Sequence, residues 1–438
     1  MITKKQVTLG LGLVTACFTA IQLYLALLMP HLQPIHNLRL TTLQKFLVKC
    51  EAFKIRCVLL DHQTLSNLNY TPAKGYDRCA HLCQNRFYTF AVHDTDYKAL
   101  KMEVLPIMSR LGYKILISSS EFIQTGIPTH IHLLHKDTPL IHLAVLHQMK
   151  TWWWYDSTKQ TPFVSDFMKS EGVLDEFNCG RVTIDEIDVL IPDSLQHFLK
   201  VYDKSKFLRC NTTRAEVFHE WYGKDTTEKA EQFRSDAINA LKIIKTRLDS
   251  IGTPFWLSSG TLLGWFRQCD IIPYSLDVDI GIFIKDHPEN LLNILHNSSL
   301  RLEHKFGLME DSLQYAFHIG NVKLDIFFFY LDETSGTMWN GGTDYNTGEK
   351  FKYLFDKFTL CWTEFFGMKV RVPCDTEQYI RANYGDSWIE PVTKWEWNKS
   401  PPNVEPNGEW QDDQLNDAIQ LWDKEGKRIP LEWYRDES

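Results

Sequence analysis

Apolar and polar positions along the chain follow three kinds of pattern. Residues 7–29 contain no charged side chain, and this run exceeds the roughly 20 residues that a helix needs to cross a bilayer. Short apolar runs at 56–60, 87–92 and 114–117 alternate with mixed segments, which is typical of an α/β fold. Over 228–250 apolar residues recur every three or four positions, which predicts a helix with one buried face.

The first apolar segment predicts an uncleaved membrane anchor. Lys4 and Lys5 precede it, and the first cation after it is Arg39. The positive-inside rule then places residues 1–6 in the cytosol and the rest in a lumen. A cleaved signal peptide is the alternative, but it would have an apolar region of about 7–15 residues and a small-x-small cleavage site. We therefore expect a single-pass type II membrane protein with a stem at 30–50.

The remaining length suits two lumenal domains. A break near Ser205 separates an N-terminal α/β domain, 51–204, from a second domain, 205–438. With 44% hydrophobic and 23% charged residues, the composition is that of a globular protein. A net charge of −8 argues against nucleic-acid binding through a basic surface. The mean hydropathy of −0.27 excludes a protein with several membrane spans.

Other lumenal features agree with an oxidising compartment. Asn211 and Asn297 each begin a glycosylation sequon. Of the 10 cysteines only Cys17 lies in the predicted span, so an odd number remains and at least one thiol is free or intermolecular. Cys79 and Cys83 could form a zinc half-site, but no second pair of this kind follows, which favours a disulfide or buried thiols.

The candidate chemistry begins where the predicted helix ends. Gly252 and Pro254 terminate that helix, and 254–257 predicts a short buried strand. The small residues of Ser258–Gly264 follow. They predict a turn and a helix starting at Thr261, which together would present backbone N–H groups and a hydroxyl to an anion.

Three acids lie in two apolar runs that predict neighbouring strands. Asp277 and Asp279 are two residues apart in 277–284, so they share one face, and Asp325 lies within 322–329. Buried carboxylates so close together repel each other unless a divalent cation neutralises them. Mg²⁺ or Mn²⁺ would suit such ligands. The pair would hold the metal on a diphosphate, and the third acid would bind metal or accept a proton from an acceptor hydroxyl.

Other polar and aromatic residues admit two interpretations each. Arg267 and Lys323 could neutralise phosphate or lie at solvated ends of elements. Trp152–Trp154 could stack on sugars, but a buried position is favoured. Five histidines could form a metal cluster, although core and surface strand positions are favoured: His130, His132, His135, His142 and His147.

These motifs resemble the LicD-type phosphotransferases, which have a nucleotidyltransferase fold. The residues that support this resemblance are Gly260–Gly264, Arg267, Ile272–Tyr274 and Asp277–Asp279. Within that group the chain is most similar to the fukutin family. Segments that support this closer resemblance include Phe255–Thr261, Leu324–Tyr330, Phe351–Phe355 and Ser400–Val404. The resemblance implies an α+β nucleotidyltransferase-like catalytic domain at 205–438, behind an anchor, a stem and the N-terminal α/β domain.

The family's activity implies a metal-dependent enzyme of the Golgi membrane, with the endoplasmic reticulum as an additional expected location. Such an enzyme transfers ribitol 5-phosphate from CDP-ribitol to a phosphorylated O-mannosyl glycan of α-dystroglycan, and the fukutin-related protein, an expected partner, adds the second unit. The resemblance implies that metal and diphosphate bind Asp277, Asp279 and Asp325. Further residues would contact the nucleotide donor: Ser259, Gly260, Thr261, Gly264, Arg267 and Lys323.

The residues themselves leave two alternatives open. An Asp-x-Asp pair also occurs in lumenal glycosyltransferases that use nucleotide sugars through a metal. A catalytically silent scaffold that recruits partner Golgi transferases is the third possibility, although it has no need for three acids at one site.

The first lumenal domain also has a pattern similar to that of the second. The matching segments are Phe90–Asp94 with Ile282–Asp286, Leu140–His147 with Lys323–Tyr330, and Val189–Pro192 with Val370–Pro373. In this alignment the places of the three acids are taken by Asn85, Phe87 and His142. The hypothesis is a degenerate repeat that has lost its metal site, and a different strand order in the two domains would exclude it.

Overall fold

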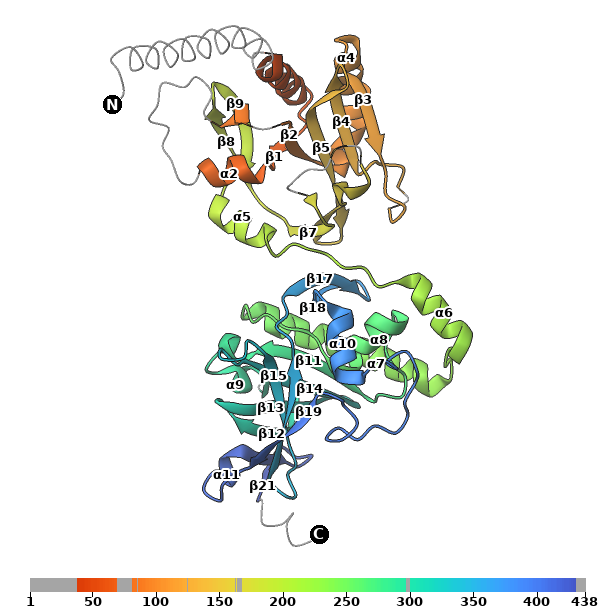
Figure 1. Ribbon diagram of the computed structural model, residues 1–438, viewed down its shortest axis with the longest axis vertical. Coiled ribbons are helices and arrows are strands. Elements are labelled where there is room, and N and C mark those ends of the chain that lie inside the picture. Colours follow the sequence, from red (N-terminus) through yellow and green to blue (C-terminus); the bar gives the residue numbers. More distant parts are fainter. Residues whose placement is uncertain are drawn as a thin grey trace, which may run out of the picture. The chain divides into compact units, whose positions relative to one another are not determined.

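The computed structural model describes residues 38–68, 81–84, 86–123, 125–161, 163, 168–296 and 300–430. The chain divides into two compact units, an N-terminal unit up to Lys206 and a C-terminal unit from Phe207, both drawn in Figure 1. The segment at 7–29, expected to span the membrane, lies outside the described residues. Within the described ranges, no helix is both long enough and apolar enough for a membrane span.

A 9-stranded mixed sheet forms the centre of the N-terminal unit. Its strands are β1 (Val58–Leu59), β2 (Tyr88–His93), β3 (Lys114–Ser118), β4 (His130–His135), β5 (Thr138–Met149), β6 (Trp152–Tyr155), β7 (Gly172–Asp175), β8 (Cys179–Ile184) and β9 (Ile187–Pro192). The order is β3-β4-β5-β2-β1-β9-β8, with β6 beside β5 and β7 beside β6. Trp152, Trp153 and Trp154 are at most 9% exposed, so this run is buried, as favoured from the sequence, and does not form a sugar-stacking surface.

Helical segments connect these strands. A helix over 38–52 precedes β1. The others are α2 (His62–Leu68), η1 (Leu82–Gln84), η2 (Asp94–Asp96), α3 (Tyr97–Ala99), η3 (Leu100–Val104), α4 (Leu105–Arg110), η4 (Thr158–Gln160) and α5 (Leu195–Tyr202).

The C-terminal unit contains a 10-stranded sheet and a separate hairpin. Its strands are β10 (Trp256–Leu257), β11 (Asp277–Phe283), β12 (Arg301–Leu308), β13 (Asp311–Ile319), β14 (Val322–Leu331), β15 (Met338–Thr343), β16 (Glu349–Phe355), β17 (Leu360–Phe365), β18 (Met368–Pro373), β19 (Val404–Glu409), β20 (Ile419–Trp422) and β21 (Arg428–Ile429). The order is β19-β16-β15-β14-β13-β12-β20-β21, with β11 beside β14 and β10 beside β11, while β17 pairs with β18.

The helical segments of this unit are α6 (Thr212–Tyr222), α7 (Glu228–Ser250), α8 (Ser259–Gln268), η6 (Ile284–Asp286), α9 (Leu291–His296), α10 (Thr376–Tyr384) and α11 (Leu415–Ala418). Helix α7 has the bounds predicted from the sequence. The Thr227 hydroxyl accepts a hydrogen bond from the Ala230 N–H and caps its start. Its apolar stripe, including Leu241, Ile244 and Leu248, is buried, and each such side chain contributes about 1.5–3 kcal/mol.

The two units share one strand order. The series β1-β2-β5-β4-β3 corresponds to β10-β11-β14-β13-β12. In both series the first two strands are antiparallel, the next pair is parallel, and the remaining pairs are antiparallel. This shared order is the outcome that the repeat hypothesis requires.

The pairing registers correspond as well. Leu59 lies opposite Phe90 as Leu257 lies opposite Ile280. The next residue donates an equivalent hydrogen bond in each unit, from Leu60 N–H to the Thr89 carbonyl at 2.9 Å and from Ser258 N–H to the Asp279 carbonyl at 3.1 Å.

These registers correct the sequence alignment of the acids by two residues on one strand. Thr89 lies opposite His142 as Asp279 lies opposite Asp325. His142 therefore takes the place of Asp325 as expected, but Thr89, not Phe87, takes the place of Asp279. Alternating strands match equally well after a shift of two residues, because such a shift keeps each side chain on its face. Asn85 lies outside the described residues.

Candidate active site

Three carboxylates meet at the centre of the C-terminal sheet. Strands β11 and β14 are parallel, and Asp279 lies opposite Asp325. Each acid, Asp277 included, offers a carboxylate oxygen, and these oxygens all lie within 4.8 Å of one another. The alternating neighbours Val278, Ile280, Leu324 and Ile326 are fully buried in the core. Since side chains alternate along a strand, this anchoring turns the acids to the opposite face.

The first turn of α8 holds Asp279 in position. Gly260 N–H donates to Asp279 Oδ2 at 2.9 Å, and Asp279 N–H donates to Thr261 Oγ1 at 2.8 Å. A Cβ on Gly260 would lie 3.2 Å from both Asp279 Oδ2 and Ser275 Oγ, so glycine permits this close approach. Helix α8 begins at Ser259, two residues earlier than expected. That 259–261 faces a nucleotide stays a prediction.

Two polar side chains that the sequence did not single out complete the surroundings of the acids. The Ser275 hydroxyl donates to the Asp277 carboxylate, and Gln314 Nε2 donates to Asp325 Oδ1 at 3.3 Å. Lys323, which was singled out, places its Nζ 3.0 Å from Asp325 Oδ2. Ser275 directly follows the Ile272–Tyr274 motif and could have been found there, whereas nothing in the sequence around Gln314 indicates its contact.

Electrostatics at the site disfavour three ionised acids together. Burial, followed by the negative charges of Asp277 and Asp325, raises the pKa of Asp279 well above its usual value. Burial raises the pKa of Asp325 to about 6, against the opposing effect of Lys323. For Asp277 burial also raises the pKa, and the Ser275 hydrogen bond opposes it. For all three acids burial is the largest cause and disfavours the charged form, so a bound cation would stabilise the ionised cluster.

Lysine 323 supplies one positive charge to the cluster. Burial alone would lower the pKa of its ammonium, but the charge of Asp325 and the hydrogen bond to it outweigh burial and raise the pKa. One cation beside three carboxylates leaves an excess of negative charge when all three are ionised. The donor set, three buried carboxylates, suits Mg²⁺ or Mn²⁺.

Two other residues that were predicted to contact the nucleotide donor, Arg267 and Gly264, make packing contacts in the structure. Arg267 is only 1% exposed, its Nη2 donates to Gln268 Oε1 at 2.8 Å, and its guanidinium lies 4.5 Å from the centroid of the Phe218 ring. A Cβ on Gly264 would lie 2.5 Å from the Asp270 carbonyl oxygen. None of the contacts described for Arg267 or Gly264 involves the three acids, so these contacts give both residues a packing role. The burial of Arg267 also excludes a position at a solvated end of an element.

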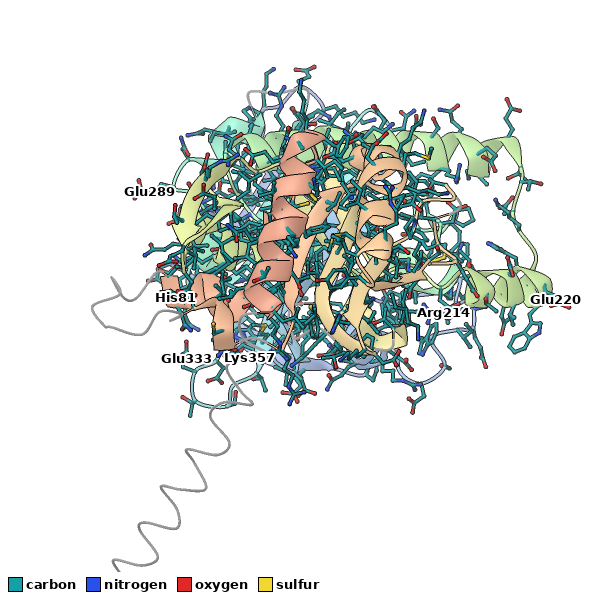
Figure 2. All side chains as sticks on the ribbon, turned by 90° about the horizontal axis from the view of Figure 1, so that it is seen from above. His81, Arg214, Glu220, Glu289, Glu333 and Lys357 are labelled. Carbon is teal, nitrogen blue, oxygen red and sulfur yellow. A yellow bond between two sulfur atoms is a disulfide. The ribbon has the colours of Figure 1, made fainter. Side chains whose placement is uncertain are left out.

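Helix α6 is fixed to this part of the unit by a second arginine. Figure 2 shows Arg214 and Glu220 on this helix. The Arg214 guanidinium lies 3.7 Å from the centroid of the Phe266 ring and 5.7 Å from that of Trp388. Cation–π contacts of this kind contribute about 0.5–2 kcal/mol each.

Two tyrosines of α10 lie beside the acid cluster. The Tyr379 hydroxyl is 2.9 Å from Ser258 Oγ. Burial first, and then the negative charge of Asp279, raise the pKa of both Tyr379 and Tyr384. Helix α10 is therefore linked through Ser258 to the strand that carries Asp279, a feature that the sequence alone did not show.

The histidines of the N-terminal unit form a buried cluster without the geometry of a metal site. His130, His132 and His142 are at most 1% exposed. His130 Nδ1 lies 3.0 Å from His142 Nε2, and Thr89 Oγ1 lies 3.3 Å from His142 Nδ1. Among the residues that the structure describes, only the three acids bring enough potential metal ligands together. These three histidines therefore occupy core positions on strands, the interpretation that the sequence favoured.

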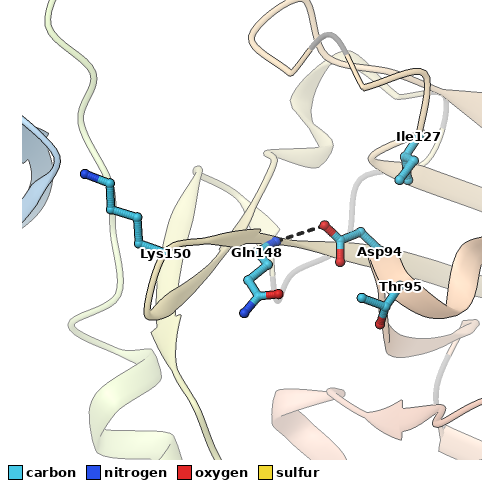
Figure 3. Close-up of a pocket in the computed structure, with 5 residues that line it drawn as sticks. All are labelled: Asp94, Thr95, Ile127, Gln148 and Lys150. Carbon is cyan, nitrogen blue, oxygen red and sulfur yellow. Dashed lines mark hydrogen bonds between the residues drawn. The ribbon is translucent and has the colours of Figure 1, made fainter.

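A hollow of about 500 Å³ also lies in the N-terminal unit (Figure 3). It is lined by Asp94, Thr95, Ile127, Gln148 and Lys150. Asp94 Oδ2 accepts a hydrogen bond from the Gln148 N–H at 3.0 Å. None of the residues singled out for catalysis or donor binding lines this hollow.

The cysteines divide between the units. The C-terminal unit contains the disulfides Cys210–Cys269 and Cys361–Cys374. Cys83 is disulfide-bonded, which makes the zinc half-site interpretation wrong. The free cysteines among the described residues are Cys50, Cys57 and Cys179.

Two family models match different parts of the chain. Residues 252–375 match the model of the LicD/FKTN/FKRP nucleotidyltransferase domain. Residues 30–238 match the model of the Fukutin N-terminal region. All three acids lie within the first of these matches.

Curated relatives cover much of the chain. It is 46% identical over 309 residues to a human protein named ribitol-5-phosphate transferase FKTN, and this match covers 68% of the chain and 66%, just under two thirds, of the human protein. It is 39% identical over 409 residues to the mouse protein of the same name, covering 86% of the chain and 87% of the relative. A short segment of 39 residues is 49% identical to the mouse ribitol 5-phosphate transferase FKRP, covering 9% of the chain and 8% of that protein.

Proposed function

Since the chain belongs to the fukutin family of proteins with a LicD-type nucleotidyltransferase domain, we propose that it is an enzyme that transfers ribitol 5-phosphate from CDP-ribitol. The acceptor would be a hydroxyl of a phosphorylated O-mannosyl glycan on a glycoprotein such as α-dystroglycan. The observation that supports this most directly is the group of three carboxylates within 4.8 Å of one another, inside the matched nucleotidyltransferase region.

Divalent-metal dependence is part of the proposal. Asp277, Asp279 and Asp325 would hold Mg²⁺ or Mn²⁺, which would neutralise charge on the donor diphosphate as it develops during transfer. The chain's own contribution is to keep the carboxylates in place. Gly260 and Thr261 fix Asp279, and Lys323 lies against Asp325.

Asp325 is the candidate proton acceptor. A carboxylate can act as a general base when it lies within reach of the acceptor hydroxyl. The acceptor hydroxyl would give its proton to the Asp325 carboxylate while its oxygen attacks the phosphorus that bears ribitol. The bond from that phosphorus to the bridging oxygen of CMP breaks, and CMP leaves with the electron pair. A negatively charged donor and a negatively charged acceptor meet at this phosphorus, so local cationic groups such as Lys323 lower the repulsion.

The proposal extends to location and partners. The uncharged segment at 7–29, preceded by Lys4 and Lys5, supports a single-pass type II membrane protein, and its location in the Golgi is proposed from the family alone. The sequons at Asn211 and Asn297 agree with a lumenal catalytic unit. The fukutin-related protein is the proposed partner enzyme, acting on the same glycan.

CMP release tests the proposal directly. The purified full-length chain is incubated with CDP-ribitol, Mn²⁺ or Mg²⁺ and a phosphorylated O-mannosyl glycopeptide. We expect release that requires both metal and acceptor and is lost in Asp279→Ala. Release no greater than that of Asp279→Ala would contradict the proposal. Consumption of a nucleotide sugar in its place would favour the glycosyltransferase alternative.

A further inference from the structure

Two partly exposed tryptophans lie in the segment between α10 and β19. Trp395 is 39% exposed and Trp397 is 41% exposed. Neither takes part in the three hydrophobic core clusters of the described residues. Exposed aromatic groups that lie together mark candidate binding surfaces, whereas single ones need no explanation.

Trp397 is held rigidly although it is exposed. A Cβ built on Gly342 would lie 2.8 Å from Trp397 Cζ3, so the indole rests against a position where only glycine fits. The Phe351 ring meets it edge to face at 5.4 Å between centroids. The Trp397 carbonyl accepts a hydrogen bond from the Tyr353 hydroxyl at 2.8 Å. A ligand stacking on this indole would therefore cost little side-chain entropy.

The strand registers place Trp397 on the sheet face that carries the acids. Asn340 of β15 lies opposite Phe329 of β14, and residues opposite each other share a face. Phe329 is four residues from Asp325, and Gly342 is two residues from Asn340, so all four positions share that face. The indole that rests on Gly342 therefore covers the same face as Asp325.

Trp395 approaches the acids through α10. Its ring lies 5.0 Å from that of Tyr384. Tyr384 ends α10, and Tyr379 of the same helix has its hydroxyl 2.9 Å from Oγ of Ser258, whose N–H donates to the Asp279 carbonyl. The two tryptophans thus lie in one segment, Trp395 beside Tyr384 of α10 and Trp397 over β15 on the face that carries Asp325.

We propose that Trp395 and Trp397 form an aromatic platform on which sugar rings of the acceptor glycan stack. The proposal rests on the proposed function, because it assumes a glycan acceptor at the acid site. Indole faces pack well against the C–H surfaces of sugars. A small nucleotide would be enclosed over about 70–90% of its surface, whereas a glycan attached to a protein must stay open on one side. Indoles that remain about 40% exposed suit the second kind of ligand.

Steady-state kinetics of the full-length chain test the platform. Trp395→Ala and Trp397→Ala should each raise the acceptor KM about 3- to 10-fold, and leave kcat and the CDP-ribitol KM within about twofold. Trp397→Phe keeps a ring against Gly342 and should have a smaller effect. Trp221→Ala is the matched control, since Trp221 is an exposed indole, at 67%, on α6 of the same unit. A rise in the donor KM without a rise in the acceptor KM would overturn the proposal.

A binding measurement separates this proposal from the proposed function. The glycopeptide acceptor is titrated into the full-length chain without donor, and tryptophan fluorescence and equilibrium dialysis follow binding. Loss of affinity in both alanine variants, but not in Trp221→Ala, would support the platform even if CDP-ribitol proves to be the wrong donor. Equal affinity of the wild type and both variants would overturn it. Absence of acceptor binding to the wild type would overturn it as well.

Discussion

The two units place opposite chemistry at the same point of the same strand arrangement. At the paired positions of the parallel strands, the C-terminal unit has Asp279 and Asp325, and the N-terminal unit has Thr89 and His142. The neighbouring antiparallel strand contributes a polar contact in each. Gln314 contacts Asp325 at 3.3 Å, and His130, at the corresponding position, contacts His142 at 3.0 Å.

Burial acts on both sites in the same direction, against charge. It raises the pKa of Asp279 and Asp325 and lowers the pKa of His130 and His132 to about 4. The N-terminal cluster is therefore neutral at neutral pH and needs no counter-ion. Three acids in the C-terminal unit can all be ionised only with help from cations. One strand arrangement thus supports a metal-type site or a closed polar core, and the side chains decide which.

The largest expected effect on activity comes from replacing an acid of the C-terminal site by the residue type found at the corresponding position of the N-terminal unit. Asp325→His removes both a carboxylate ligand and the proposed proton acceptor, so CMP release should fall by about 10²–10³-fold or more. Thr89→Val, at the place of Asp279 in the other unit, should leave the rate within about twofold. If Asp325→His retained most of the activity, the assignment of the acids would be wrong.

The reverse exchange should damage stability and leave the acid site intact. His142→Asp places a carboxyl group in a fully buried position with no cation among its described contacts. We expect the unfolding free energy of the N-terminal unit to fall by about 3–5 kcal/mol. Hydrogen exchange of the backbone amides of β2 and β5 measures this loss. His142→Asn, which is neutral, is the control and should cost less. Equal losses in the two variants would show that charge does not determine the cost.

Acidification should destabilise the N-terminal unit. In the unfolded chain a histidine binds its proton near pH 6.5, but His130 and His132 accept theirs only near pH 4 when folded. The unfolded state therefore binds protons first as pH falls. Stability is fully present above pH 6.5 and declines down to about pH 4, by up to about 1.4 kcal/mol per pH unit for each histidine.

Limited proteolysis across this pH range measures the effect. Replacing His132 by Phe should make the proteolysis rate depend less steeply on pH, because it removes one of the titrating groups. A profile as steep as that of the wild type would exclude His132 as a cause.

The smallest expected effect is a gain in stability without metal. Asp279→Asn removes a carboxyl group whose pKa is raised by burial and by its two acidic neighbours. The amide oxygen of the asparagine can still accept the hydrogen bond from the Gly260 N–H. In chelator, the melting temperature of the C-terminal unit should rise by about 2–4 °C for each kcal/mol recovered. A lower melting temperature than that of the wild type would mean that the acids do not repel one another in the folded state.

Local sequence patterns predicted the elements whose formation depends on neighbours in the chain. Helix α7 was predicted with its bounds because its apolar stripe and its terminating Gly252 are both local signals. The shared face of Asp277 and Asp279 followed from strand alternation, and the contact with Asp325 from the presence of a second apolar run. These signals were sufficient to locate the acid cluster.

Features that depend on distant residues could not be predicted in this way. The packing of Arg267 on Phe218, the contact of Gln314 with Asp325 and the disulfide Cys210–Cys269 each join separate segments. The alignment of β2 with β11 was misplaced by two residues for a related reason. Alternation fixes which face a residue occupies, while its position along the strand is fixed by the pairing.

Mn²⁺ binding to the full-length chain tests the difference between the units most directly. Electron paramagnetic resonance of free Mn²⁺ gives the amount bound as the metal is titrated. We expect saturable binding that is lost in Asp279→Asn and unchanged in Thr89→Val and His132→Phe. Binding that persists in Asp279→Asn, or that disappears in either variant of the N-terminal unit, would contradict a metal site confined to the three acids.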